Sequence, residues 1–382
     1  MQAENDSYNG TMFDFGNPVL KQTVPIIAVF VISYFVVFAM CVVGNVLVCF
    51  VVLKIPRMRN VTNFFILNLS VSDLLVAVFC MPFTLVDNII RGWPFGNVMC
   101  KLTPAVQVVS VTASVFTLVA IALDRYYAII YPTEPKFTIK RTMYVIAGVW
   151  ILAIIVAIPQ VLLIQDGRFP REGDVIYLHI CEEPYPYWRK AYTTVLFGLC
   201  YICPLMVIMY LYARIGYSVW IKPTPGGDKA SKEAKSLAMS KKMRVIKMLV
   251  TVVILFTISW LPIHVITMIN DYATLSDGRR DIIYVYIYPV AHWLIYFNSS
   301  VNPIIYGYFN QNFRVAFKTL LLTRRGVGAL QADMSNANGA HTARHSRSPN
   351  PRSASRSPRP VASPMPRSPM VDTQIKSLPD VN

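Results

Sequence analysis

Ionisable side chains stand inside two stretches of this sequence that are otherwise apolar. Asp73 lies in the middle of one stretch, and Asp124-Arg125-Tyr126 ends another. A charged group within a lipid bilayer is costly and is retained mostly where it binds an ion, pairs with another charge or switches partners. The two acids fall at opposite depths, and no serine, zinc or paired-aspartate constellation indicates an enzyme. We therefore expect ion binding and a switchable ion pair.

Apolar segments of membrane-crossing length must position these residues, because about 30 Å of hydrocarbon takes roughly 20 helical residues. Hydrophobic residues make up 54% of the chain and charged residues only 15%, too few to cover a water-facing surface. The predicted fold is an all-α membrane protein, a bundle of seven transmembrane helices. The segments cover about residues 25–53, 63–90, 98–129, 142–164, 190–220, 245–271 and 282–308. Kinks are expected at the prolines within them, Pro82, Pro159, Pro204, Pro262 and Pro303.

Basic residues between the segments predict the orientation in the cell membrane. The net charge is +16, and basic residues follow the first segment, precede the sixth and fill the C-terminal region. Loops rich in lysine and arginine stay in the cytoplasm, so residues 1–24 are expected outside and the C-terminus inside. Asn5 and Asn9 are then glycosylation acceptors, and no cleaved signal peptide is expected.

Cysteine placement predicts one disulfide. Cys100 stands at the outer start of the third segment and Cys181 in the second outer loop, whereas the other cysteines fall inside apolar segments. Disulfides form on the oxidising side of the membrane. We therefore expect a Cys100–Cys181 bond.

Arg-Ser-Pro repeats occupy the region 324–382, which we expect to be a disordered cytoplasmic tail and a substrate of kinases. Similar tracts occur in RNA-binding proteins. Because the basic residues here follow seven membrane spans and do not gather on one folded face, no nucleic-acid partner is expected.

Each predicted helix carries its own polar or proline signature, and together these resemble the rhodopsin-like (class A) G-protein-coupled receptors over residues 25–317. The signatures are Gly44-Asn45, Asp73, Asp124-Arg125-Tyr126, Trp150, Pro204 with Tyr212, Phe256-Thr-Ile-Ser-Trp260-Leu-Pro262 and Asn302-Pro303-Ile-Ile-Tyr306. The resemblance implies coupling to heterotrimeric G proteins, with arrestin and kinases acting at the tail. It also implies an amphipathic eighth helix over 309–323, which Phe309, Phe313 and Phe317 at helical spacing favour.

The resemblance also implies roles for these residues in activation. Asp124 would hold Arg125 until a G protein enters, and Phe256 with Trp260 would repack beneath a bound ligand. Stacked aromatics of the core would show the same pattern. The remaining switch residues are Tyr126, Tyr212, Asn302, Pro303 and Tyr306.

A sodium ion that stabilises the inactive bundle is the one cofactor that the resemblance implies. Its oxygen ligands would come from Asp73, Ser114, Asn298, Ser299 and Asn302. The alternative is a hydrated polar network without a bound ion.

Two positions narrow the ligand class within this family. Gln107 stands where amine receptors carry an aspartate, which argues against small biogenic amines. Tyr296 stands where opsins carry the retinal lysine, so no Schiff base can form. The polar residues before the first helix are too few for a folded ectodomain, and we expect the ligand to bind within the bundle and its outer loops.

A finer resemblance is to neuropeptide FF receptors, which are related to neuropeptide Y, SIFamide and other RFamide receptors. It rests on Asn60-Val-Thr-Asn-Phe-Phe-Ile-Leu-Asn-Leu-Ser-Val-Ser-Asp73, on Gly92-Trp-Pro-Phe and on Ala291-His-Trp-Leu-Ile-Tyr-Phe-Asn-Ser-Ser. The resemblance implies a short amidated peptide whose arginine pairs with Asp271. The other expected ligand-binding residues are Thr84, Gln107, Glu182 and His292.

Two alternatives remain open at this point. One is a peptide receptor of another class A group, such as neuropeptide Y, SIFamide or chemokine-like receptors. The other is a transporter or channel, which inverted internal repeats would favour; the helix signatures differ from one another and show no such repeat.

Overall fold

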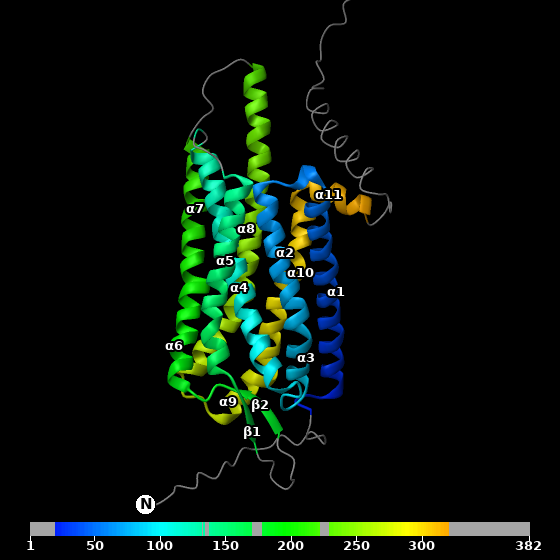
Figure 1. Ribbon diagram of the computed structural model, residues 1–382, viewed down its shortest axis with the longest axis vertical. Helices are drawn as coiled ribbons and strands as arrows, with labels where there is room; N and C mark the ends of the chain where they lie inside the picture. The colour runs from blue at the N-terminus through cyan, green and yellow to red at the C-terminus, as the bar shows by residue number, and fades with distance from the viewer. Residues whose placement is uncertain (1–19, 132, 134–136, 170–177, 222–228, 321–382) are drawn as a thin grey trace, which may run out of the picture. The chain divides into compact units, whose positions relative to one another are not determined.

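Long helices lie side by side in a bundle in the computed structural model, which describes residues 20–131, 133, 137–169, 178–221 and 229–320 (Figure 1). The first are α1 (Val24–Lys54), η1 (Pro56–Met58), α2 (Val61–Phe79), α3 (Met81–Ile89), α4 (Gly96–Ile130) and α5 (Ile139–Leu163). The others are α6 (Pro186–Phe197), η2 (Gly198–Ile202), α7 (Cys203–Ile221), α8 (Lys229–Tyr272), α9 (Asp277–Ile282), η3 (Ile283–Ile287), α10 (Tyr288–Phe309) and α11 (Gln311–Lys318).

Six of the predicted membrane spans correspond to helices, or continuous helix pairs, that are long and apolar enough to cross a bilayer within the described part of the chain. The seventh is made of α9, η3 and α10, and it carries many tyrosines together with His292, Asn298 and Asn302. Those three polar residues are buried. The seventh span is therefore less apolar because it turns polar groups toward the other helices, and the predicted bundle is confirmed.

Several features of the helices differ from the expected spans. The second span breaks at Cys80, two residues before Pro82, and the fifth and seventh contain the π turns η2 and η3. Pro204 follows η2, and because proline has no N–H it cannot complete the α-helical bond to the residue four positions earlier. Helix α8 begins well before the predicted residue 245 since the preceding stretch, although polar, is rich in alanine and lysine, which favour helix.

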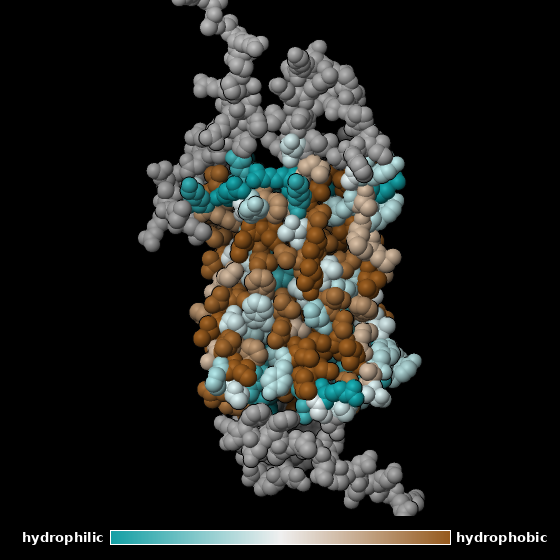
Figure 2. Space-filling model, turned by 180° about the vertical axis from the view of Figure 1, so that it is seen from behind, coloured by the Kyte–Doolittle hydropathy of each residue, from teal (hydrophilic) through white to brown (hydrophobic). Residues whose placement is uncertain are grey.

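The flank of the bundle is apolar. Figure 2 shows hydrophobic side chains over the middle of the molecule and hydrophilic ones toward its two ends. Large apolar residues are widely exposed there, among them Phe35 and Leu162, each 69% exposed. In water such a surface would aggregate, and it instead suits the hydrocarbon of a membrane.

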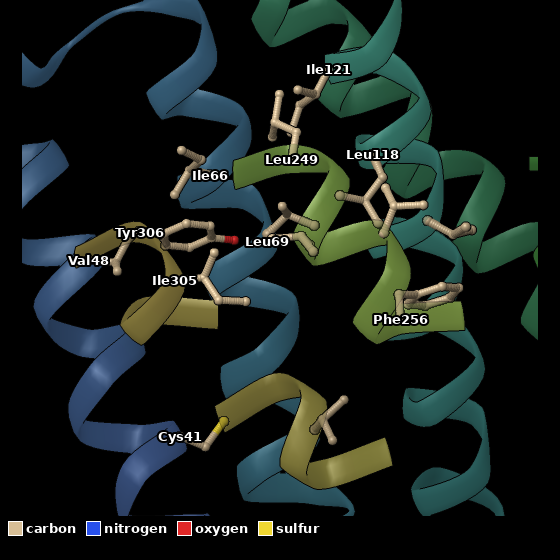
Figure 3. Packing of buried hydrophobic residues seen from close by; sticks show 14 of the residues in the cluster. Cys41, Val48, Ile66, Leu69, Leu118, Ile121, Leu249, Phe256, Ile305 and Tyr306 are labelled. Carbon is tan, nitrogen blue, oxygen red and sulfur yellow. The ribbon is translucent and has the colours of Figure 1, made fainter. Parts of the chain in front are cut away.

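The core between the helices joins residues from both ends of the chain (Figure 3). Tyr306 on α10 lies beside Val48 of α1 and Ile66 of α2, and all three are fully buried. Gly44 lets α1 approach α10, because a Cβ atom at this position would lie 2.8 Å from Cγ of Pro303. A larger side chain would push the two helices apart.

Buried amides fasten the helices to one another. The side-chain amide of Asn45 donates to the backbone oxygen of Ser299 over 3.2 Å. Asn68 donates to Thr117 over 2.8 Å and accepts from the indole of Trp150 over 2.8 Å. Two of the signature residues found in the sequence, Asn45 and Trp150, thus stabilise the bundle directly, since unpaired polar groups in lipid are costly.

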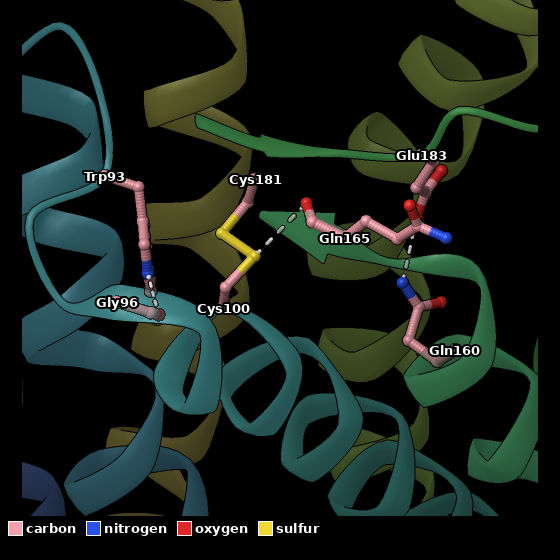
Figure 4. Close-up of a disulfide and its surroundings, with 7 residues drawn as sticks. All are labelled: Trp93, Gly96, Cys100, Gln160, Gln165, Cys181 and Glu183. Atoms are coloured by element: carbon pink, nitrogen blue, oxygen red, sulfur yellow. Dashed lines mark hydrogen bonds between the residues drawn. A yellow bond between two sulfur atoms is a disulfide. The ribbon is translucent and has the colours of Figure 1, made fainter. Parts of the chain in front are cut away.

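A two-stranded hairpin covers the end of the bundle where α3 ends and α4 begins, and it was not expected from the sequence. Strand β1 (Gln165–Phe169) pairs antiparallel with β2 (Leu178–Glu182), with Asp166 opposite Cys181. The predicted disulfide is confirmed, because Cys181 is bonded to Cys100 at the start of α4, with their Cα atoms 5.6 Å apart (Figure 4). The hairpin is therefore anchored to the bundle.

The eighth helix begins two residues later than predicted, and residues 321–323 of the predicted range lie outside the described residues. Helix α11 covers Gln311–Lys318, and Phe309 belongs to the end of α10. The side chain of Asn310 accepts from the backbone N–H of Asn312 and so caps the start of α11. Phe313 is fully buried. Asn5, Asn9 and the tail from 324 lie outside the described residues.

Candidate functional site

A cavity of about 560 Å³ opens at the end of the bundle that the hairpin covers. Residues from α3, α4, α5, α10 and the second outer loop line it. The polar ones are Lys21, Thr84, Asp87, Arg91, Thr103, Gln107, Gln160, Glu183, Tyr288 and His292. A cavity of this size accommodates part of a short peptide.

The floor of the cavity carries neutral hydrogen-bonding groups. The hydroxyl of Tyr296 donates to Oγ1 of Thr84 over 2.7 Å and lies 3.4 Å from Oε1 of Gln107. One turn above, Nδ1 of His292 lies 3.2 Å from the backbone oxygen of Tyr288, and the two rings meet edge to face. Residues of α3, α4 and α10 therefore meet at one point and offer both donors and acceptors.

An ion-paired cluster lies between the cavity wall and α8. Arg189 on α6 contacts Oδ1 of Asp271 over 2.8 Å, and its Nε lies 3.8 Å from a carboxylate oxygen of Glu183. Thr193 donates to the other oxygen of Asp271 over 2.6 Å. Gln160 donates to Glu183 over 2.9 Å (Figure 4). We call Glu183, Arg189 and Asp271 the rim cluster.

The two acids of the rim cluster differ in their access to the cavity. Glu183 lines it, whereas the side chain of Asp271 is only 1% exposed because Arg189 covers it. Burial raises the pKa of Glu183, an effect that Gln160 and Arg189 oppose. Glu183 therefore offers its carboxyl group to the cavity, whereas Asp271 is ion-paired with Arg189 within the protein.

A second acid, Asp87, lines the opposite part of the cavity. Its carboxylate lies 3.7 Å from the ammonium of Lys21, which also donates to the backbone oxygen of Asp87. The segment that holds Lys21 is tied to the end of α3, because Leu20 forms a β-bridge with Ile90. The N-terminal segment therefore forms part of the cavity wall.

Three of the five predicted ligand-binding residues, Thr84, Gln107 and His292, line this cavity. Glu182 and Asp271 are not among the described residues that do. The sequence analysis missed the part that Glu183, Arg189 and Tyr296 play in the site. Glu183 was one of many acids at the outer surface, and Tyr296 was considered only as a replacement for lysine.

A small polar cavity of about 20 Å³ lies in the middle of the bundle, enough for one ion or water molecule. It is lined by the five predicted sodium ligands, together with Ser110 and apolar residues of α2, α4 and α8. Asn302 donates to Oδ2 of Asp73 over 2.8 Å. Within the described part of the chain, the amide oxygens of Asn298 and Asn302 find no protein donor. One carboxylate beside neutral oxygens fits a hard monovalent cation.

The aromatic pair of α8 stands next to this cavity. Phe256 and Trp260 line it, and their rings are stacked with centroids 5.7 Å apart and planes 28° apart. Tyr201 of η2 lies against Phe256 at 6.5 Å. Movement of these rings would therefore shift both η2 and the lining of the polar cavity.

The inner end of the bundle holds a third cavity, of about 410 Å³, lined by Asp124 and Arg125. The guanidinium of Arg125 is ion-paired with Asp124, and it donates to the hydroxyl of Thr62 on α2 over 2.8 Å. Asp124 is 6% exposed. The pair is therefore formed, and Arg125 is turned toward α2.

The other predicted switch residues lie around the inner half of the bundle. Tyr306 is fully buried against Phe313 of α11, with ring centroids 6.0 Å apart. Tyr126 contacts Tyr131 edge to face, and Tyr212 packs against the core. These contacts join α10 to α11 and pack the aromatic residues at the end of α4 against one another.

Comparison with known sequences gives matches over most of the chain. Residues 44–306 match the family described as 7 transmembrane receptor (rhodopsin family). Neuropeptide FF receptor 2 of Rattus norvegicus is 48% identical over 300 residues, covering 76% of this chain and 72% of the rat protein. Neuropeptide FF receptor 1 of Homo sapiens is 46% identical over 314 residues, covering 80% and 72%. The RYamide receptor of Tribolium castaneum is 36% identical over 301 residues, covering 76% and 79%.

Proposed function

This chain belongs to the rhodopsin family of seven-transmembrane receptors, and from that membership we propose that it is a receptor for a short peptide that ends in an arginine followed by an amidated aromatic residue. The chain is a multi-pass membrane protein that signals through G proteins and is not an enzyme. The relatives named for neuropeptide FF and RYamide support an amidated peptide as the ligand class.

The observation that carries the proposal is the pairing of a neutral floor with an ion-paired rim in one outer cavity. Thr84 and Gln107 on the floor offer a donor and an acceptor, which is what a terminal carboxamide needs. A free carboxylate would prefer a cation there. The rim cluster carries two carboxylates around one guanidinium, which suits the arginine of the peptide.

We place the peptide's arginine at the rim cluster, where it would exchange places with Arg189 as the partner of Asp271. Its guanidinium would meet Glu183 at the cavity wall and replace Arg189 at Asp271, while Arg189 keeps Glu183 as a partner. The exchange leaves each charge paired, which matters because an unpaired buried charge is strongly destabilising. The bound peptide thereby links α8 to the cavity wall, above the aromatic pair.

The test compares three synthetic peptides on cells that express the receptor: one ending in Arg-Phe-amide, the same peptide with a free carboxylate, and the same amide with alanine in place of arginine. The amidated arginine peptide should bind best, and each change should lower affinity by about tenfold or more. Displacement of a labelled peptide measures affinity, and G-protein activation reports the response. Equal potency of the amide and the free acid would contradict the proposal.

We propose an orientation with the hairpin outside and α11 in the cytoplasm, supported by the disulfide of the hairpin and by the basic loops. The inner cavity with Arg125 is then the place where the G protein docks. Arrestin and kinases would act at the tail beyond the described residues.

Sodium should lower the affinity of the peptide, because the polar cavity around Asp73 would hold the ion in the inactive bundle and ligand and ion would then oppose each other reciprocally. Peptide displacement in sodium chloride should give a Kd several-fold higher than in potassium chloride at the same ionic strength, a difference typical of such coupling. Asp73→Asn should remove the difference.

The two salts control for screening of surface charge, which acts equally in both. Ser70→Ala serves as the matched variant, since Ser70 is a buried polar residue of the same helix that does not line the cavity. Equal affinity of the wild-type receptor in the two salts would contradict the sodium site. It would favour the alternative, a hydrated polar network without a bound ion.

A further inference from the structure

The hydroxyl of Tyr296 touches both residues of the cavity floor assigned to the carboxamide. It lies 2.7 Å from Thr84 Oγ1 and 3.4 Å from Gln107 Oε1. Thr84 belongs to α3, Gln107 to α4 and Tyr296 to α10. We propose that Tyr296 is a positioning residue that determines specificity, since its hydroxyl fixes Thr84 and Gln107 in the arrangement that distinguishes a carboxamide from a carboxylate. This inference rests on the proposed function.

The ring of Tyr296 is held rigidly, as a positioning role requires. It is fully buried, and Tyr34 meets it edge to face with centroids 5.8 Å apart and planes 74° apart. The ring of His292 stacks on it at 6.2 Å. The hydroxyl of Tyr296 therefore has little freedom to leave its two neighbours.

The donors and acceptors of the cavity floor explain why this placement selects an amide. The phenol donates one proton, and both Thr84 Oγ1 and Gln107 Oε1 act as its acceptors. The proton of the Thr84 hydroxyl and the side-chain NH₂ of Gln107 then remain available to the ligand's carbonyl oxygen. Gln107 Oε1 keeps a second lone pair, which can accept from the NH₂ of the carboxamide but repels a carboxylate.

Without the phenolic proton, the floor would lose this selectivity. Gln107 would be free to turn its amide, so that it could present only N–H donors to a carboxylate. Thr84 Oγ1 would also lose its buried partner. The amidated peptide should then bind less well, and the free acid should bind as well as before or better.

The experiment measures the affinities of a synthetic peptide ending in Arg-Phe-amide and of the identical free acid for wild type, Tyr296→Phe and Tyr34→Phe receptors at the cell surface. Tyr296→Phe should reduce the ratio of amide affinity to acid affinity by about tenfold. Tyr34→Phe is the matched control, because it removes a buried hydroxyl from the same aromatic group that bonds to Asn88 and the backbone oxygen of Pro289 instead of the floor. Its ratio should stay at the wild-type value.

Thr84→Val, alone and with Tyr296→Phe, provides a second measure. The two substitutions should be less than additive in their effect on the ratio, since both break the same hydrogen bond. An unchanged ratio in Tyr296→Phe, or an equal loss in Tyr34→Phe, would overturn the inference while leaving the proposed function standing. A wild-type receptor that binds both peptides equally would overturn both.

Discussion

Replacing Asp271 with alanine should lower the affinity of a peptide ending in Arg-Phe-amide by about thirtyfold or more. A guanidinium and a partly desolvated carboxylate form a charge-assisted bond, and truncating one partner of such a pair typically costs about 2 to 5 kcal/mol. The same substitution should change little for the peptide with alanine in place of arginine. Displacement binding with both peptides on both receptors gives the coupling energy between the two groups.

Arg189→Ala tests whether the peptide's arginine replaces Arg189 as the partner of Asp271. If the peptide's arginine displaces Arg189 from Asp271, removing Arg189 should raise the affinity of the arginine peptide, because no internal partner has to leave. Arg280→Ala is the control for general electrostatics, since it removes the same charge from an exposed position of α9. A loss of affinity in Arg189→Ala as large as in Asp271→Ala would contradict the exchange.

Arg125→Ala should abolish G-protein activation while peptide binding persists. Arg125 lines the inner cavity and is held there by Asp124 and Thr62, so its release would present a guanidinium to an entering G-protein helix. Asp124→Asn should have the opposite effect on basal activity. Weakening an ion pair that contributes about 1.5 to 3 kcal/mol would shift the equilibrium toward the active state by roughly tenfold or more.

Nucleotide exchange on a purified G protein, with and without peptide, measures both effects. Arg141→Ala is the matched control, because Arg141 is an exposed arginine at the start of α5 near the same end of the bundle. It should signal as the wild type does. A fully active Arg125→Ala receptor, or an Asp124→Asn receptor with wild-type basal activity, would contradict this assignment.

The membrane explains why the spans could be predicted from the sequence. A helix in lipid must satisfy its own backbone bonds and expose apolar side chains, so composition alone indicates the spans and their order. The break at Cys80 and the turns η2 and η3 could not be predicted in the same way. They depend on how a proline-containing helix reorganises its hydrogen bonds against particular neighbours.

The sequence predicted single residues of the candidate site but not the contacts between them. Gln107 and Thr84 were expected at the cavity and do line it, because each follows from its place along one helix. The partners of Asp271 were not foreseen, since Arg189 and Thr193 belong to a different helix that no local pattern connects to α8. The prediction of the cavity floor lacked Tyr296 for the same reason, because the hydrogen bonds of Tyr296 join three helices.

The π turn η2 separates the residues that hold Asp271 from the inner part of the same span. Arg189 and Thr193 precede it on α6, and α7 follows it. One residue corresponds to about 100° of rotation in an α-helix, so gaining or losing a single residue within Gly198–Ile202 would reorient the whole of α6 around its axis. Evolution could thus redirect ligand preference by a one-residue insertion or deletion at this turn, while the part of the span that faces the G protein kept its own sequence and orientation.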